Sequence, residues 1–502
     1  MNGNSSTEGP GWQRSQVEGD LYQGKFRVLF SFLSVLAVVT VTLEFMLARA
    51  GMDDPDIWWH LRDAEYLFQH HQLPRFDMFS FTVAGHPWIN HEWLAEIPFY
   101  LAWRAWGIMG LKTLEILLLQ MIFAGLLYLS WKESANFKAA FVACAFCSFL
   151  ASTSFGPRTI LFGYAWLVFL LIVLQRFRLR GKAPLWVIPL LFCLWVNTHG
   201  SWLIGLICFA IIILAGFLKG TWGRITAEQW TEVQRRHLAV TWVASVIALF
   251  INPFGFRLVL YPFDLAFRQK LNIAHIAEWV PVNLRDTNGR LVMVLLLALL
   301  LSALLRDRRW ALSGLVLALF GLYCGLGYVR FLFLLALLVA PLLAKLLDFL
   351  PLYKPKLEVP WLNAFAILLL VGAMLYYWPR SSALQRSIDK KYPAGALAFL
   401  KAHPPQGRLL NFYTWGGYLE WNNRDIPVFI DGRADIFEYA GIFQDYIDVL
   451  GGDRTKRILD KYQIQYVLFP PDQLLTDSLQ HDAGWKTLYS DDVSVLLERA
   501  KD

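Results

Sequence analysis

The segment 53–62, which reads DDPDIWWHLR, packs three carboxylates, an imidazole, a guanidinium and two indoles into ten positions. Its Asp54 and Asp56 are candidates for a general base or for ligands of a divalent cation. His60 and Arg62 follow on the same segment. A helix cap with interfacial tryptophans would account for a lone aspartate, but the added imidazole and guanidinium make a functional site an equal alternative.

Other candidate side chains lie far away in the sequence, within or beside apolar stretches. They are Glu44, His91, Glu92, Arg158, His199, Glu278 and Arg330. An ionisable side chain at membrane level is costly and usually has a partner or a role. The structural alternatives are snorkelling for the arginines, a helix-end hydrogen bond for His199 and a favourable position in the helix dipole for Glu92.

Membrane-spanning helices must position these side chains. Of the 502 residues, 56% are hydrophobic and 17% are charged, which is typical of a polytopic α-helical membrane protein. Residues 1–25 are polar and lack the features of a cleavable signal, so we expect a cytoplasmic amino-terminal tail. All five cysteines lie in apolar stretches, which predicts core packing and not zinc binding or disulfides.

The transmembrane part is expected at 26–379, with about eleven spans if each crosses a core ~30 Å thick. The spans are predicted at 28–48, 110–131, 139–155, 159–174, 185–197, 202–218, 238–251, 291–305, 311–327, 331–349 and 361–378. Basic clusters lie at 176–182, 219–224, 306–309 and 354–356. The positive-inside rule puts all four on the cytoplasmic side if residues 92–106 lie flat as an interfacial amphipathic helix.

This topology brings distant polar residues to the exterior face. The external loop 51–108, the turns 156–158 and 197–200, the loop after Pro253 and Arg330 all lie there, as does the carboxyl-terminal region. Such convergence predicts a site between the spans and an external domain. The net charge of +7 suits contact of the inner loops with anionic lipid. Nothing in the sequence indicates nucleic-acid binding or identifies a protein partner.

Residues 380–502 contain no further span and predict a small external α/β domain. We expect a strand at 466–469 and a helix at 394–401. A further strand, predicted at 428–431, ends in the sequence Asp-Gly-Arg. Charged groups at the carboxyl end of a strand occupy a favoured ligand position in α/β sheets. A glycine-containing turn with a salt bridge between Asp431 and Arg433 is the structural alternative.

The chain resembles the GT-C superfamily of polyprenyl-phosphate-dependent glycosyltransferases in its Asp-rich first external loop, interfacial helices, about eleven spans and external domain. The segment 56–62 is similar to the Asp-Pro-Trp-Phe-Asn-Tyr-Arg segment of catalytic oligosaccharyltransferase subunits, whose first Asp belongs to the catalytic site. Residues 415–418 resemble their Trp-Trp-Asp-Tyr-Gly region, but Gly416 and Gly417 lack its acidic residue, so sequon recognition is not implied. The overall pattern is similar to a family of bacterial multi-span proteins.

The resemblance implies an inverting transfer of a sugar from a polyprenyl-phosphate donor to an acceptor, at the exterior face of a bacterial inner membrane. Asp54 or Asp56 would be the base, and Arg158, Arg330 and His199 would bind the donor phosphate. The cavity-lining or acceptor-binding candidates are His60, Arg62, His91, Glu92, Glu278, Trp415, Tyr418, Asp431 and Arg433.

Two points remain open from the residues alone. A divalent cation held by Asp54, Asp56 and Glu92 is compatible with the residue types, although the spacing does not require one. A transporter or lipid flippase and a non-catalytic envelope scaffold are the alternative functions, but no internal repeat of the kind common in transporters is evident. Enclosure of the exterior carboxylates and arginines in one cavity would favour the transferase.

Overall fold

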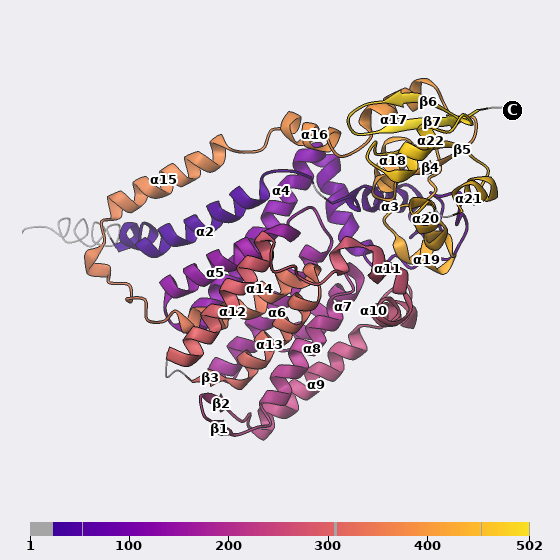
Figure 1. The fold of residues 1–502 in the computed structure, drawn as a ribbon. Helices are drawn as coiled ribbons and strands as arrows, with labels where there is room; N and C mark the ends of the chain where they lie inside the picture. Colours follow the sequence, from indigo (N-terminus) through magenta and orange to yellow (C-terminus); the bar gives the residue numbers. More distant parts are fainter. Residues whose placement is uncertain (1–23, 53, 306–308, 453, 501–502) are drawn as a thin grey trace, which may run out of the picture.

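The computed structural model describes residues 24–52, 54–305, 309–452 and 454–500. Most of the predicted tail 1–25 lies outside these ranges, as do Asp53 and the basic residues Arg306 and Arg308. The chain forms a bundle of helices and a smaller carboxyl-terminal unit built on a sheet (Figure 1).

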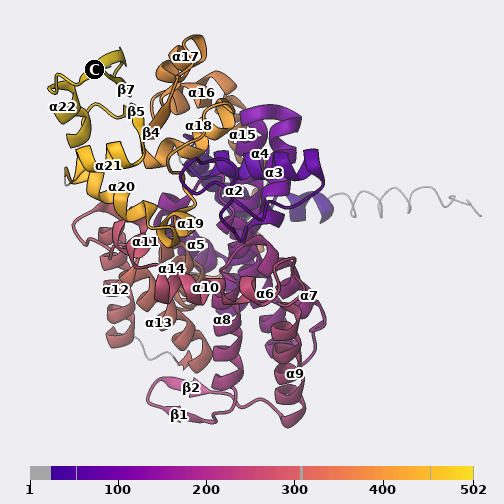
Figure 2. The same cartoon turned by 90° about the vertical axis from the view of Figure 1, so that its right-hand side faces the viewer.

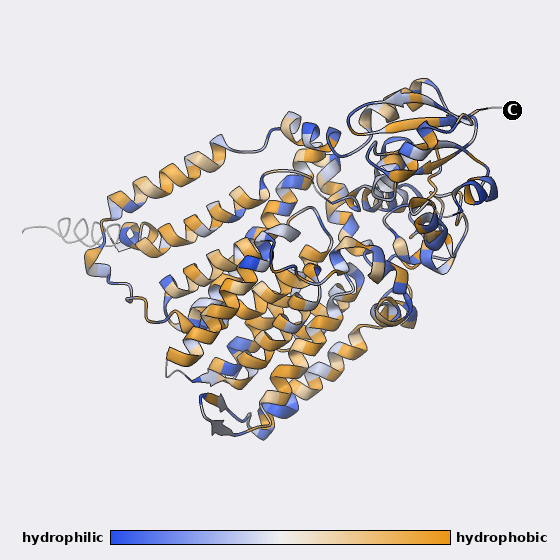
Figure 3. Ribbon diagram, viewed as in Figure 1, coloured by the Kyte–Doolittle hydropathy of each residue, from blue (hydrophilic) through white to orange (hydrophobic). Residues whose placement is uncertain are grey.

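Within the described residues, a helix coincides with each predicted span. These helices are α2 (Phe32–Ala48), α4 (Trp93–Ser134), α5 (Phe137–Ala151), α6 (Ile160–Arg180), α7 (Val187–Thr198), α8 (Trp202–Ala215), α9 (Glu232–Ala248), α12 (Thr287–Leu305), α13 (Leu312–Gly327), α14 (Leu332–Leu346) and α15 (Pro360–Tyr376). Apolar residues dominate these helices (Figure 3).

By length and composition, five helices of the described residues can cross a membrane, or six if α15 and α16 (Ser381–Asp389), bent by 53°, form one span. Four further apolar helices are shorter than the usual span. The chain is therefore a polytopic membrane protein, and the count of eleven spans stays a prediction.

The predicted interfacial helix 92–106 forms the first part of α4. Helix α4 breaks at Trp106 and Gly107, whose φ/ψ angles of −150°/21° and 56°/−140° leave the helical region. The positive φ at Gly107 is one that glycine adopts readily. An interfacial amphipathic helix would expose its charged side chains and bury its leucines, but Glu96 is buried against His60 of α3 (Ile57–His70) while Leu101 is exposed.

A second amphipathic helix, α10 (Phe256–Arg268), was not predicted from the sequence. Its Phe256, Leu260, Phe263 and Phe267 are exposed and recur at helical spacing. Tyr261, on the other face, is buried and stacks on His91 with ring centroids 4.0 Å apart. Helix α10 thus presents an apolar face beside the first external loop, as an interfacial helix would.

The carboxyl-terminal unit contains a four-stranded sheet of order β4-β5-β7-β6. Strand β4 (Arg408–Asn411) is parallel to β5 (Ile464–Phe469), and β7 (Val495–Arg499) is antiparallel to β5 and to β6 (Trp485–Ser490). Its remaining helices are α17 (Ala394–Ala402), η5 (Tyr413–Trp415), α18 (Gly416–Asn422), α19 (Ala434–Tyr439), α20 (Ile442–Leu450), α21 (Thr455–Lys461) and α22 (Leu474–Gln480). The predicted strand 466–469 and helix 394–401 are confirmed.

The strand predicted at 428–431 is wrong. Val428 makes only an isolated parallel bridge with Ser80 of the first external loop. The Val428 N–H donates to Phe79 O at 3.1 Å, and the Phe429 N–H donates to the side chain of Asn411 at 2.7 Å. The external loop and the Asn411 side chain thus form the hydrogen bonds that the backbone of this buried segment needs. The segment joins the external loop to the carboxyl-terminal unit without entering the sheet.

Short elements complete the two ends of the bundle. The connecting segments are η1 (Ser152–Ser154), α11 (Lys270–His275), η2 (Ala277–Trp279), η3 (Val329–Phe331) and η4 (Pro355–Leu357). A small sheet of order β1-β2-β3, with β1 (Gly220–Trp222), β2 (Ile225–Ala227) and β3 (Trp310–Ala311), closes one end. Both views place it opposite the carboxyl-terminal unit, which covers the end formed by α3, α10 and α11 (Figure 2).

Candidate functional site

A polar cavity of about 80 Å³ lies at the end of the bundle that the carboxyl-terminal unit covers. It is lined by Asp54, Asp56, His60, Glu92, Ser154, Arg158, Thr159, Ile160, Tyr164, His199, Glu278 and Arg330. Six separate stretches of the chain contribute to it, at 54–60, 92, 154–164, 199, 278 and 330. At roughly 10–15 Å³ per water position, the enclosed space holds a few water-sized groups.

Arg158 is the central cation of the cavity. Its Nε donates to Asp54 Oδ2 at 2.6 Å, and its Nη1 lies 2.6 Å from Glu278 Oε1. Burial alone would lower the pKa of Arg158, but the two carboxylates raise it above the usual value. Burial raises the pKa of Asp54 against the opposing effect of Arg158. The turn before α6 thus links the first external loop to η2 through one guanidinium.

Arg330 lines the same cavity but lacks a comparable partner. Its buried Nε has no hydrogen-bond partner within the described part of the chain. The guanidinium stacks on the Trp279 ring with its carbon 4.1 Å from the ring centroid. An unpaired N–H at a buried guanidinium is costly, and an anion entering the cavity would satisfy it.

Glu92, at the start of α4, contacts three histidines. Its carboxylate oxygens lie 3.3 Å from His60 Nε2, 3.3 Å from His199 Nε2 and 3.5 Å from His91 Nε2. The Ser201 N–H donates to His199 Nδ1 at 3.0 Å, which leaves the Nε2 of neutral His199 to donate to Glu92. Burial lowers the pKa of His199 well below its usual value and that of His91 to about 3.

His60 lies between two carboxyl groups, because its Nδ1 is 3.0 Å from Glu96 Oε1 and its Nε2 faces Glu92. Burial lowers the pKa of His60, so the imidazole is neutral near neutral pH. A neutral imidazole donates from only one nitrogen. One of the two carboxyl groups must therefore carry a proton to complete both contacts.

Asp56 faces the cavity with one carboxylate oxygen held in place. Its Oδ1 accepts from Trp59 Nε1 at 3.1 Å, and its backbone N–H donates to Asp54 Oδ1 at 2.7 Å. Burial and the neighbouring Asp54 raise the pKa of Asp56 well above its usual value. Gly432 of the carboxyl-terminal unit lies so close that a Cβ there would overlap Asp56 Oδ1. The carboxyl-terminal unit thus helps to fix the position of Asp56.

Several predicted site residues do not line this cavity. Asp431 and Arg433 form a buried ion pair of 2.5 Å, and Arg433 also reaches Asp77 at 2.6 Å. Burial raises the pKa of Asp431, but Arg433 outweighs it and the net shift is downward. This cluster fastens the carboxyl-terminal unit to the first external loop, so the structural alternative describes Asp431 and Arg433 here.

The aromatic segment 415–418 serves packing. Trp415 is buried and donates to Lys391 O at 2.9 Å, and Tyr418 stacks on Tyr392 with centroids 4.8 Å apart. A Cβ on Gly417 would lie 3.0 Å from the backbone nitrogen of Trp59, so the glycine at 417 lets α18 approach α3 closely. Arg62 pairs with Glu65 at 2.6 Å, and His91 stacks on α10; both lie outside the cavity lining.

Four lining residues were missed: Ser154, Thr159, Ile160 and Tyr164. Thr159 and Ile160 directly follow the predicted turn 156–158, so their proximity could have been inferred. Tyr164 lies one turn further along α6, and its hydroxyl donates to Arg330 O at 3.4 Å. No sequence signal marked that contact, because it joins positions 166 residues apart.

A divalent cation does not fit the carboxylates as they are arranged. Among the described residues, no three or more His, Cys, Asp or Glu side chains form a group that could hold a metal ion. Asp54 is engaged by Arg158, and Glu92 is engaged by His60 and His199. Glu44, the predicted intramembrane acid, meets Ser148 of α5 away from the cavity.

A solved structure of another protein has a similar fold. The structure aligns with that of the Archaeoglobus fulgidus oligosaccharyltransferase, which was determined with a tethered acceptor peptide containing the NVT sequon, at a TM-score of 0.55. The alignment covers 94% of this chain and 75% of that chain, with 14% sequence identity. At this identity the likeness concerns the fold alone. The sequence matches no protein-family model and no curated protein.

Proposed function

We propose that the chain is a GT-C glycosyltransferase that moves a sugar from a polyprenyl-phosphate donor to an acceptor at the exterior face of the membrane. The observation that carries the proposal is the enclosure of Arg330 and Asp56 in one cavity, with the buried Nε of Arg330 unpaired among the described residues. An anion-binding group and a proton acceptor in one enclosed site are what transfer from a phosphate requires.

Asp56 is the better candidate for the base. Asp54 already binds Arg158 at 2.6 Å, whereas Trp59 is the hydrogen-bond partner of one side-chain oxygen of Asp56 and the other oxygen has none among the described residues. A raised pKa makes ionised Asp56 a stronger proton acceptor at neutral pH than an ordinary aspartate. In the proposed step Asp56 takes the proton of the acceptor, the acceptor forms a bond to the sugar carbon from the opposite face, and the carbon–oxygen bond to the phosphate breaks.

The leaving polyprenyl phosphate gains negative charge, which the guanidinium of Arg330 would bind. Arg158 contributes positive charge nearby and keeps Asp54 in place. His199 and His60 are neutral, so they would orient groups through hydrogen bonds and not through charge. Binding of the donor lipid chain beside α10 is consistent with the exposed apolar face of that helix.

The donor-binding step can be tested without knowing the acceptor. Wild-type protein and an Arg330→Gln variant, purified in detergent, are titrated with polyprenyl monophosphate. Binding is followed by intrinsic tryptophan fluorescence, with Trp279 as the nearby reporter. We expect a loss of affinity of at least about tenfold in the variant. Arg408→Gln, at an exposed guanidinium over Phe81, is the matched control and should bind normally. Equal binding by all three proteins would overturn the assignment.

The alternatives make different predictions. A transporter or flippase would lose transport on changing Arg158 or Glu44 and would tolerate Asp56→Asn, whereas a scaffold would tolerate all three changes. Orientation is tested separately with reporter fusions. A fusion after Trp378 should be active only outside, and one within 176–182 only inside, as the positive-inside rule requires. Activity of both on one side would contradict the placement of the cavity at the exterior face.

A further inference from the structure

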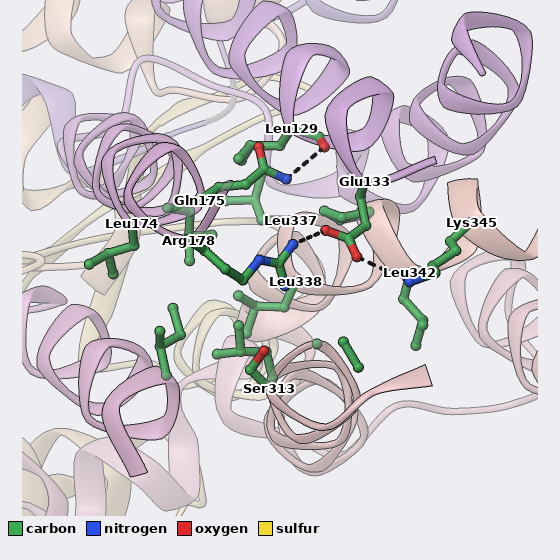
Figure 4. A pocket seen from close by; sticks show the side chains of 16 residues that line it. Leu129, Glu133, Leu174, Gln175, Arg178, Ser313, Leu337, Leu338, Leu342 and Lys345 are labelled. Atoms are coloured by element: carbon green, nitrogen blue, oxygen red, sulfur yellow. Dashed lines mark hydrogen bonds and ion pairs between the residues drawn. The ribbon is translucent and has the colours of Figure 1, made fainter. Parts of the chain in front are cut away.

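Two further cavities lie at the opposite end of the bundle, under the sheet β1-β2-β3. The larger cavity, of about 470 Å³, is polar and is lined by the last turns of α4, α6 and α14 together with β2 and the start of α13. A narrower apolar slot continues from it between α4, α6, α13 and α14. Glu133, Arg178, Ser313 and Lys345 line both cavities, so the two adjoin each other. Figure 4 shows these four side chains in the narrower one.

The polar cavity carries excess positive charge. Glu133 accepts from Arg178 and lies 3.5 Å from Lys345 Nζ, so one carboxylate faces two cations. Lys132 and Glu228 also line the cavity, which gives three cations against two carboxylates among its described residues. The side chains of Arg178 and Lys345 keep 27% and 32% of their surface exposed, so an anion can reach them.

Most of the side chains that line the slot are apolar. Leu129, Leu174, Leu337 and Leu338 line it, with Gly314 at its wall. Figure 4 shows these leucines around the ion cluster of Glu133, Arg178 and Lys345. A soluble phosphate would gain nothing from such a lining, whereas a lipid would bury part of an acyl chain in it.

We propose that these joined cavities bind one anionic membrane phospholipid, with its phosphate against Arg178 and Lys345 and the first part of an acyl chain in the leucine slot. Basic pockets between helices on the cytoplasmic side are a known setting for anionic headgroups. The arrangement follows from the contacts above and does not depend on the glycosyltransferase proposal. The site lies at the other end of the bundle from the cavity that contains Asp56.

The slot is tested by filling it. A Cβ on Gly314 would meet no atom within 4 Å, so Gly314→Phe projects a ring into open space and removes a helical glycine. Gly372 of α15 also has open space at its Cβ and lines neither cavity, which makes Gly372→Phe the matched control. Native mass spectrometry of the purified full-length proteins, with phosphatidylglycerol added, should show at least about tenfold weaker binding for Gly314→Phe only.

The headgroup is tested by charge. Wild type should bind phosphatidylglycerol at least about fivefold better than phosphatidylcholine, and Lys345→Gln should remove that preference. Lys401→Gln, at an exposed lysine of α17, is the charge control. Equal binding of the two lipids by wild type, unchanged binding by Gly314→Phe, or displacement of the lipid by equimolar glycerol phosphate would each overturn the proposal. The last result would identify a site for a soluble phosphate.

Discussion

Asp56→Asn separates the proposed chemistry from the stability of the fold. The amide keeps the size of the side chain and an oxygen that can accept from Trp59 Nε1, which lies 3.1 Å from Asp56 Oδ1 in the wild-type protein. The backbone N–H of position 56 keeps its bond to Asp54 Oδ1 at 2.7 Å. What the variant loses is the negative charge and the ability to take a proton. A change in activity without a loss of stability would therefore report on the base itself.

Asp56→Asn is expected to lower the transfer rate but to keep or raise the stability of the fold. Loss of a general base lowers the transfer rate by roughly 10²–10⁴, which is about 3–5 kcal/mol in the activation barrier. Burial and Asp54 raise the pKa of Asp56 in the folded state. Its contribution to stability is therefore complete below the unfolded pKa and is lost as pH rises through the folded pKa, by about 1.4 kcal/mol for each pH unit that separates the two pKa values. Asp56→Asn avoids that loss, so its unfolding temperature should equal or exceed that of wild type at neutral pH.

The rate is measured as transfer of radiolabel from polyprenyl-phosphate sugars, supplied one at a time, into membrane products, and stability by thermal unfolding in detergent. Asp389→Asn, at an exposed aspartate that accepts from Gln385 at 2.9 Å, is the control and should keep full activity. Full transfer by both Asp56→Asn and Asp54→Asn would refute a base in this loop. A lower unfolding temperature for Asp56→Asn at neutral pH would refute the electrostatic argument.

Three further changes test other parts of the structure. Gly432→Ala adds a Cβ that overlaps Asp56 Oδ1, so we expect a loss of transfer on the order of tenfold to a hundredfold with protein yield unchanged. Lys112→Met leaves Glu115 buried without its 2.7 Å partner and should lower unfolding free energy by about 3–5 kcal/mol; the double variant with Glu115→Leu should recover most of it, and no recovery would contradict the pairing. Burial raises the pKa of Asp435 to about 7, so its stabilising contribution is present below pH ~4 and is lost as pH rises through about 7. Asp435→Asn should therefore raise stability at pH ~8 by up to about 4 kcal/mol and leave it unchanged at pH ~4, and equal changes at both pH values would count against this pKa.

Much of the candidate cavity could be predicted because polar residues next to apolar stretches are conspicuous. Asp54 and Asp56 are predicted from the dense polar segment 53–62, and Arg158, His199 and Arg330 from their cost at membrane level; all five line one cavity. They come together because the alternation of helices decides which end of the bundle each turn occupies. It does not distinguish Asp54 from Asp56, since that depends on which carboxylate Arg158 reaches.

The carboxyl-terminal unit shows where local patterns fail. The apolar run 428–430 has the composition of a strand, yet loop backbone and Asn411 satisfy its hydrogen bonds. Asp431 and Arg433 carry charge after this run, but they pair with each other inside the protein, and Arg433 also pairs with Asp77. Gly432 between them is the residue that approaches Asp56. The residue types thus pointed to the right segment, but the residue in it that approaches Asp56 is Gly432 and not one of the charged residues.

The sequence by itself determined the membrane class, the helical stretches and the end of the bundle at which each polar turn lies. These properties follow from transfer free energies and charge that add up along a short stretch of chain. Only the tertiary structure decided that Arg158 joins Asp54 to Glu278, that the Nε of Arg330 has no partner among the described residues, and that a carboxyl-terminal glycine packs on Asp56. Such contacts join positions more than a hundred residues apart, and they depend on side-chain packing that no local pattern specifies.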